Sequence, residues 1–138
     1  MDNILVTEHP QGLSAKLADF GFATCLSLTD PHIRHCKGTR RGYMAPEIHR
    51  ARTEPGESYD GKAADMFALG VVLFALVLGR LPFEYATPTD RHYSLIAEQR
   101  EEEFKATHCG ALEQLRNQDD AMAEEFIELF LGLVSASP

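Results

Sequence analysis

The sequence is poor in cysteine. Its three cysteines are odd in number, and no two of them form a Cys-x-x-Cys pair. Disulfide frameworks are built from paired cysteines and persist in oxidising compartments, so this pattern argues against one. We therefore expect ordinary thiols at Cys25, Cys36 and Cys109, in an intracellular, cytoplasmic protein.

Long apolar stretches are also missing. The longest uncharged apolar run, residues 66–78, has 13 residues, whereas a membrane-spanning helix needs about 20. The N-terminus does not show a basic region followed by an apolar one, which is the pattern of a signal peptide. We therefore expect no membrane partner.

Positive charge is scarce. The 13 basic residues are outnumbered by 21 acidic ones, and residues 98–128 alone hold ten acids against three bases. This balance argues against nucleic-acid binding. The acidic stretch is interpreted as a solvated helix face rather than a docking site. A small basic cluster interrupts the trend at Arg34, Lys37, Arg40 and Arg41.

What the sequence does contain is typical of one globular domain. The chain has 138 residues, of which 44% are apolar and 25% charged. This length suffices for one hydrophobic core. Repeats and low-complexity tracts are not visible.

Hydrophobic patterning predicts a mainly α fold with a small β-hairpin. Strand-like runs at residues 4–6 and 15–18 flank a turn-rich stretch, and a hairpin there would bring Asn3 and Asp19 close together. Residues 24–43 lack a sustained period and predict a long surface loop.

Four segments are predicted to be helical: 47–52, 62–78, 92–104 and 120–134. Pro46 begins the first, and Gly79 ends the second. The second is apolar nearly all round, so we expect it to be buried on most sides. The last carries an apolar stripe that we expect in the core, made of Met122, Phe126, Leu129, Phe130 and Leu133.

Short motifs bracket the predicted loop. Asp-Phe-Gly occupies residues 19–21, Ala-Pro-Glu occupies 45–47, and Asn-Ile-Leu-Val lies upstream at 3–6. With the intervening Gly38, Thr39 and Tyr43, this arrangement resembles a protein-kinase activation segment. Residues 59–70 and 79–84 resemble the central helix of calcium/calmodulin-dependent-type kinases and their relatives, with Phe67 where Trp is commoner.

The resemblance implies a partial kinase C-lobe of α+β class, without the N-lobe and the start of the catalytic loop. Residues 1–23 would form a metal-binding hairpin with Asp-Phe-Gly. Residues 24–47 would form the activation segment, and residues 48–138 the helical C-lobe. The sequence contains no Gly-x-Gly-x-x-Gly loop and no Val-Ala-Ile-Lys-like strand, the parts that grip ATP in this family.

By the same resemblance, Asn3 and Asp19 are the Mg²⁺ ligands of a site that uses ATP and magnesium in the intact family. The catalytic Asp of the family would lie upstream of Met1, so no catalytic residue is assigned. Met1 would then be a start inside a longer reading frame. We expect this chain alone to bind ATP poorly.

Other positions carry over to the substrate loop and to structural roles. Thr39 and Tyr43 match the region that receives the substrate in the family, and the sequence around them is typical of Ser/Thr kinases. Three residues separate Thr39 from Tyr43 here, whereas the family usually has two. In the family, Glu47 pairs with an Arg beyond this chain, unless Arg50 or Arg52 substitutes, and Asp65 bonds backbone amides upstream. The remaining structural motif residues are Phe20, Gly21, Ala45, Pro46 and Gly70.

Two further sites deserve mention on residue type alone. Ser27, Thr29 and Thr39 are hydroxyls near basic residues and could accept phosphate. His32, His35 and Cys36 could ligate zinc, although a fourth ligand is not evident.

Three functions follow as alternatives. The first is a fragment of a Ser/Thr protein kinase whose parent transfers the ATP γ-phosphate to protein substrates, this chain alone being inactive. The second is a catalytically dead kinase-like module that binds a docking partner. The third is a small zinc protein.

Overall fold

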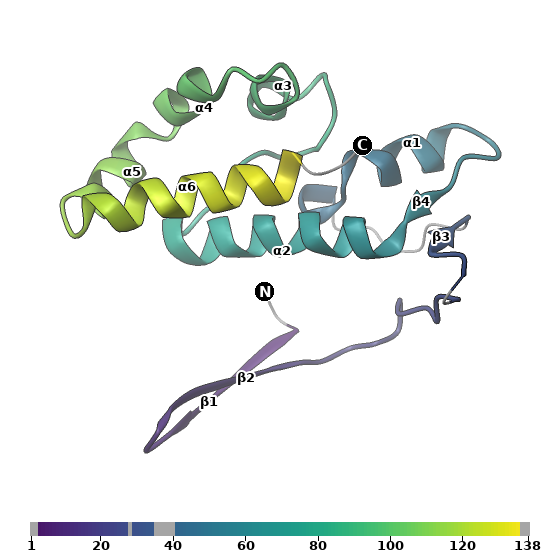
Figure 1. Cartoon of the computed structure of the whole chain (residues 1–138), viewed down its shortest axis with the longest axis horizontal. Helices are drawn as coiled ribbons and strands as arrows, with labels where there is room; N and C mark the ends of the chain where they lie inside the picture. Colours follow the sequence, from purple (N-terminus) through teal and green to yellow (C-terminus); the bar gives the residue numbers. More distant parts are fainter. Residues whose placement is uncertain (1–2, 28, 35–40, 136–138) are drawn as a thin grey trace.

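The computed structural model describes residues 3–27, 29–34 and 41–135 (Figure 1). It is mostly helical with two small antiparallel sheets, in agreement with the predicted mainly α class. The elements are β1 (Ile4–His9), β2 (Gly12–Leu17), β3 (His32–Ile33), the 3-10 helix η1 (Arg41–Tyr43), α1 (Pro46–Thr53), β4 (Tyr59–Asp60), α2 (Gly61–Leu78), α3 (Arg91–Ala97), α4 (Glu101–Thr107), α5 (Cys109–Arg116) and α6 (Asp120–Ser135).

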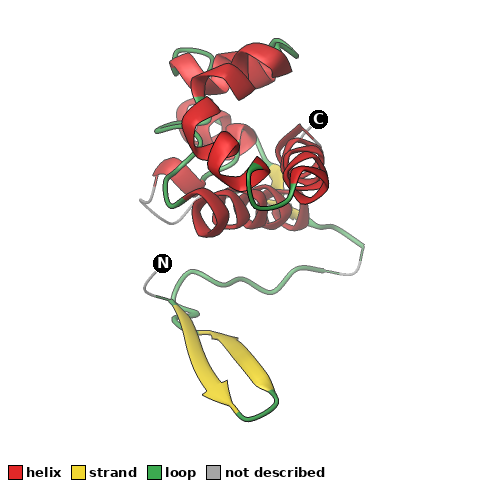
Figure 2. Cartoon of the chain, turned by 90° about the vertical axis from the view of Figure 1, so that its left-hand side faces the viewer, coloured by secondary structure: helices red, strands yellow, loops and turns green. Residues whose placement is uncertain are grey.

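The predicted hairpin is confirmed, with longer strands than the sequence pattern indicates. β1 and β2 pair from Ile4 opposite Leu17 to His9 opposite Gly12. Gly12 has a φ of 127°, which a residue with a side chain rarely adopts, and so permits the tight turn. Figures 1 and 2 show the hairpin lying apart from the helices, below α2.

Helix α2 begins and ends where the sequence predicts. The Asp60 carboxylate accepts hydrogen bonds from the backbone amides of Lys62 (2.8 Å) and Ala63 (3.3 Å), which satisfies two free donors of the first turn. At the other end, Gly79 is left-handed with a φ of 69°, and its N–H donates to the Ala75 carbonyl.

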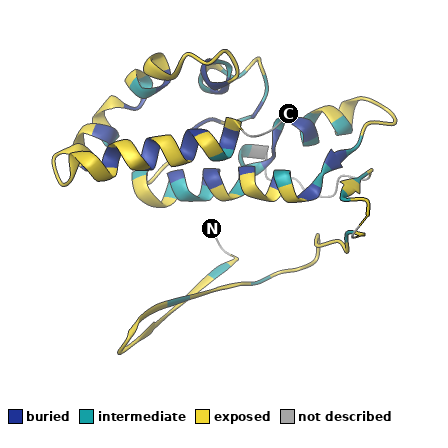
Figure 3. Cartoon of the chain, in the orientation of Figure 1, coloured by how far each residue is buried: buried dark blue, intermediate teal, exposed yellow. Residues whose placement is uncertain are grey.

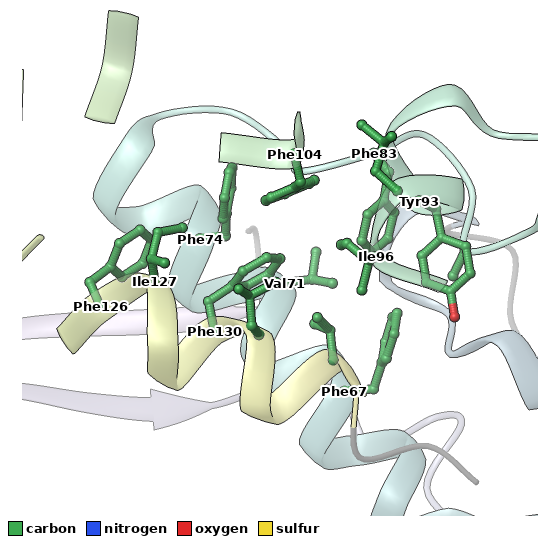
Figure 4. Packing of buried hydrophobic residues seen from close by; sticks show 14 of the residues in the cluster. Phe67, Val71, Phe74, Phe83, Tyr93, Ile96, Phe104, Phe126, Ile127 and Phe130 are labelled. Carbon is green, nitrogen blue, oxygen red and sulfur yellow. The ribbon is translucent and has the colours of Figure 1, made fainter. Parts of the chain in front are cut away.

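The core lies mainly where α2 meets α6, with α3, α4 and α5 covering it (Figure 4). Phe74 of α2 is fully buried, and its ring centroid lies 4.6 Å from Phe130 and 5.9 Å from Phe126 of α6. Gly70 allows the two helices to approach, because a Cβ there would lie 2.9 Å from the Leu133 Cβ.

The expectation that the second predicted helix is buried on most sides is wrong. The side of α2 away from α6 exposes four large apolar side chains, Met66, Leu69, Leu76 and Val77. These four side chains are exposed because the described helices cover only one side of α2 (Figure 3). By length and composition α2 could cross a membrane, but one such helix is weak evidence, since core helices pass the same test.

The stripe predicted for residues 120–134 is correct only in part. Phe126 and Phe130 are buried, whereas Met122 and Leu129 are exposed. The buried side of α6 is instead completed by Ala123, Ile127, Leu131 and Val134. The face is thus rotated, because α6 packs against both α2 and α5.

A single helix over residues 92–104 is also wrong. Helix α3 ends at Ala97, and Gln99 adopts a left-handed conformation with a φ of 57°. Two hydrogen bonds close the end: Gln99 N–H donates to the Ile96 carbonyl and Arg100 N–H to the Leu95 carbonyl. This is the Schellman pattern, which usually uses glycine. Helix α5 was not predicted either.

Candidate functional site

The base of the hairpin brings the two predicted metal ligands together. The Ala18 N–H donates to the Asn3 carbonyl at 2.9 Å, which extends the strand pairing to the residue before Asp19. Asn3 and Asp19 line the same cavity, of about 520 Å³. The sequence-based expectation that these residues lie close therefore agrees with the structure.

Asp19 has an unusual backbone conformation. Its φ of 62° lies in the left-handed region, which is uncommon for residues other than glycine. Its Oδ1 accepts a hydrogen bond from the Gly21 N–H at 3.1 Å. Strain of this kind concentrates at functional sites, so the conformation supports a role for this carboxylate. Phe20, between the two, is largely exposed.

Helix α2 and the segment before α1 contribute the other wall of the cavity. Asp65, in the first half of α2, is exposed and lines the cavity with Asn3 and Asp19. Tyr43, at the end of η1, is half-buried and lines it as well. The cavity thus combines two carboxylates, an amide and a phenol.

The predicted loop after Asp-Phe-Gly is fastened to the start of α2. His32 pairs with Asp60 and Ile33 with Tyr59 in the β3–β4 ladder, and Gly61 N–H donates to the Pro31 carbonyl at 3.3 Å. A Cβ on Gly61 would lie 2.7 Å from the Ile33 Cδ1, so a larger residue here would require the Ile33 side chain to shift. Sequence reasoning missed both strands, because each has only two residues.

Asp30 organises the exposed turn before β3. Its Oδ1 accepts from the His32 backbone N–H at 3.0 Å and lies 3.1 Å from the His32 Nδ1. The backbone hydrogen bond, followed by the ring contact, lowers the pKa of Asp30. In the described part of the chain no cluster of three potential metal ligands occurs. His35 and Cys36, the other members of the predicted zinc cluster, lie outside the described residues, as does Thr39.

The hydroxyl groups predicted to accept phosphate are partly described. The Ser27 Oγ lies 3.0 Å from the Thr29 Oγ1, and both side chains are exposed. Their modification stays a prediction.

The Ala-Pro-Glu motif starts helix α1 inside the core. Ala45 is fully buried, Pro46 is the first residue of α1, and Glu47 is only 9% exposed. Burial raises the pKa of Tyr93, the Glu47 carboxylate raises it further, and Arg50 lowers it. Glu47 and Arg50 thus lie near enough to Tyr93 to act on its pKa, and the Arg50 side chain is exposed. The substitution of Arg50 or Arg52 for a more distant arginine stays a prediction.

The sequence is similar to that of known proteins along its whole length. The model of the protein kinase domain matches residues 1–138. The chain belongs to the protein kinase family. CBL-interacting protein kinase 25 from Oryza sativa subsp. japonica is 40% identical over 85 residues, which are 60% of this kinase chain and 15% of that relative. The resemblance read from the motifs is thereby confirmed.

In a protein kinase, the side-chain oxygen atoms of Asn3 and Asp19 at this cavity are candidate ligands for a metal ion. Carboxylate and amide oxygens are hard ligands of the kind that Mg²⁺ prefers. Asn3 and Asp19 supply one of each at a single cavity, so the residues present fit a divalent cation. The kinase chain spans only a small part of the length of its rice relative.

Proposed function

We propose that this chain is the C-lobe part of a Ser/Thr protein kinase that transfers the γ-phosphate of ATP to hydroxyl groups of protein substrates. The proposal rests on one observation: Asn3 and Asp19 line the same cavity, and the backbone of Asp19 is in the left-handed conformation. Membership of the protein kinase family supports phosphate transfer as the reaction. The sequence around Thr39 and Tyr43 supports the Ser/Thr class.

In this proposal each residue at the cavity has a distinct task. The Asp19 carboxylate and the Asn3 side-chain oxygen would hold Mg²⁺, which neutralises charge on the phosphate oxygens when bound. Gly21 N–H orients one oxygen of Asp19 through its 3.1 Å hydrogen bond. Tyr43, at the same cavity, would lie on the side from which the protein substrate arrives.

The chain by itself is proposed to be inactive. The sequence contains no Gly-rich loop to cover the phosphates, and positioning contributes most of the rate in phosphoryl transfer. The acidic residues that line the described cavity are Asp19 and Asp65. In this assignment Asp19 holds metal, and Asp65 has no assigned role in proton transfer.

The metal assignment is tested with Mn²⁺ as a paramagnetic probe of the ¹⁵N-labelled chain. We expect weak binding that broadens the amide signals of Ala18, Gly21 and their neighbours. Asp19→Ala should abolish this broadening. Asp30→Ala is the matched control, because Asp30 is also an exposed carboxylate after the hairpin but does not line this cavity. Broadening that persists in Asp19→Ala, or centres on Asp30, would contradict the assignment.

Activity is tested separately with radiolabelled ATP and a generic protein substrate. We expect no phosphate transfer by the 138-residue chain. The second candidate, a kinase-like module that binds protein without chemistry, is favoured by the exposed apolar side chains of α2. Robust transfer that Asp19→Ala removes would refute both the inactive chain and this second candidate.

A further inference from the structure

The carboxylate of Asp90 accepts four backbone hydrogen bonds and thereby joins two segments of the chain. Its Oδ1 accepts from the amides of His92 (2.9 Å) and Tyr93 (3.0 Å), in the first turn of α3. Its Oδ2 accepts from the amides of Glu84 and Tyr85, both at 3.0 Å, in the segment that follows α2. Asp90 is therefore more than a helix cap, because the helix uses only one of its two oxygens.

The surroundings of Asp90 favour the ionised carboxylate. Burial of this half-buried side chain raises its pKa, but the four backbone hydrogen bonds outweigh burial, so the pKa of Asp90 lies below its ordinary value. Two successive amides that point at one oxygen form a small anion-binding concavity. The ionised carboxylate thus fixes the orientation of the two peptide groups that carry these amides.

The same two peptide groups face Gly42 with their opposite edges. Each is a trans peptide, a rigid plane with its N–H and its C=O on opposite sides. The planes that donate to Asp90 carry the carbonyl oxygens of Phe83 and Glu84 and the amides of Glu84 and Tyr85. A Cβ built on Gly42 would lie 3.7 Å from the Phe83 oxygen and 3.5 Å from the Glu84 oxygen, which is ordinary contact. Asp90 and Gly42 therefore lie at opposite edges of the same two planes.

Gly42 connects these peptide groups to the candidate site. Gly42 and Tyr43 belong to η1, and Tyr43 lines the cavity of the two predicted metal ligands. The segment itself is anchored in the core, because Phe83 is buried and its ring centroid lies 5.2 Å from that of Tyr93 (Figure 4). A turn of the peptide groups that Asp90 holds would therefore move their carbonyl oxygens against η1.

We propose that Asp90 is a positioning residue of the kinase site, which sets the place of Tyr43 through these two peptide groups. The inference rests on the proposed function, in which Tyr43 lies on the side from which the protein substrate arrives. Asp90 acts through Glu84 and Gly42 and touches no reacting atom. Its loss would release two amide donors, let the peptide groups turn and shift η1 relative to the cavity.

The link is tested first by the amide signals of ¹⁵N-labelled variants without metal. Asp90→Ser keeps one oxygen to cap α3 but has none for the two amides of the preceding segment. We expect the Gly42 and Tyr43 signals to shift as much in Asp90→Ser as in Asp90→Ala, whereas the α3 signals should shift several-fold more in Asp90→Ala. Gly42 and Tyr43 signals that move only in Asp90→Ala would assign the effect to α3 and overturn the proposal.

Asp119→Ser is the matched control, because the Asp119 carboxylate caps α6 through the Met122 amide at 3.0 Å. It should leave the Gly42 and Tyr43 signals in place, and an equal shift there would overturn the proposal. Circular dichroism of each variant establishes that it is folded.

Gly42→Ala tests the same link from the other end and decides the matter if the Asp90 variants do not fold. Its Cβ would lie 2.9 Å from the Leu81 Cδ1 and 3.5 Å from the Glu84 carbonyl oxygen. The amide signals of Glu84 and Tyr85 should therefore shift, and unchanged signals would overturn the proposal.

The place of Tyr43 at the cavity is measured with Mn²⁺. Paramagnetic broadening falls steeply with distance from the ion, so the Tyr43 amide should broaden in the unmodified chain. Relative to Gly21, this broadening should fall severalfold in Asp90→Ser, and an equal ratio in the two chains would overturn the proposal. A Gly21 signal that stays sharp in the unmodified chain would contradict the metal assignment instead, and the metal-free comparison would then decide the role of Asp90.

Discussion

The hairpin and the helical body differ in how they are stabilised. The hairpin holds the two predicted metal ligands at its base, yet none of its described residues is buried. The helical body contains the aromatic core around Phe74 and no part of the β1–β2 pairing. Residues proposed for chemistry therefore lie on the part without a core of its own, at a cavity whose other wall comes from β3, η1, α1, β4 and α2.

The largest effect should come from removing the centre of the core. Phe74→Ala deletes a fully buried ring that contacts Phe104, Phe126 and Phe130. We expect a loss of about 3–5 kcal/mol in the free energy of unfolding, out of a typical total of about 5–15 kcal/mol. Urea unfolding followed by circular dichroism measures it. Leu129→Ala, at an exposed position of α6, should change the free energy by less than about 0.5 kcal/mol.

Acid should weaken the helical body through His108. This ring is 2% exposed and lies between Phe74 and Phe104, with centroids 5.0 and 4.7 Å away. Arg80 donates a hydrogen bond to its Nδ1, so that nitrogen must be the acceptor of a neutral ring. Burial, followed by the charges of Arg80 and His92, lowers the pKa of His108 to about 4.

The sign of the pH effect follows from this lowered pKa. Between pH 6.5 and 4 the unfolded chain binds a proton at His108 that the folded chain does not, so stability is complete above pH 6.5 and falls by about 2–3 kcal/mol as the pH drops to 4. His108→Phe should remove this slope in urea titrations at several pH values. An unchanged slope in the variant would assign the effect to other groups.

A smaller effect should come from the contact between α2 and α6. Gly70→Val places a Cβ within 2.9 Å of the Leu133 Cβ, and overpacking of this kind costs about 1–3 kcal/mol. Gly132→Val is the matched control, because nothing lies within 4 Å of its added Cβ. Thermal unfolding of the two variants should separate them, and similar melting temperatures would contradict the close approach.

The smallest effect on global stability is expected in the hairpin. Leu5→Thr replaces an exposed side chain, so we expect a change below about 0.5 kcal/mol in the free energy of unfolding. Amide hydrogen exchange sharpens the comparison: β1 and β2 amides should exchange at least tenfold faster than those in the middle of α2. Protection of the hairpin equal to that of α2 would mean that the two regions unfold together.

The sequence predicts the elements whose signals are local. The end of α2 is marked by Gly79, and the hairpin by two strand-like runs around a turn that contains Gly12. The break at Gln99 escaped prediction because a glutamine occupies the left-handed position that glycine usually fills. The exposed side of α2 escaped it because an apolar composition does not tell which faces have neighbours.

The candidate site was predictable to a similar extent. The proximity of Asn3 and Asp19 follows from the hairpin, since the strand register places their neighbours opposite each other. The place of Asp65 and Tyr43 at the same cavity depends on how α2 and η1 pack, which no local pattern encodes. The electrostatic effect of Glu47 and Arg50 on Tyr93 likewise joins α1 to a helix more than 40 positions away in the chain.

The two-residue ladder of β3 and β4 has a mechanical consequence. His32 is paired with Asp60, the same residue whose carboxylate holds the first amides of α2. A reshaping of the segment around His32, by a modification or a contact, would therefore act on the start of the longest helix through Asp60 and through the Pro31 carbonyl that Gly61 bonds. The start of α2 is thus the place at which a change in the segment around His32 would be transmitted to the helical core.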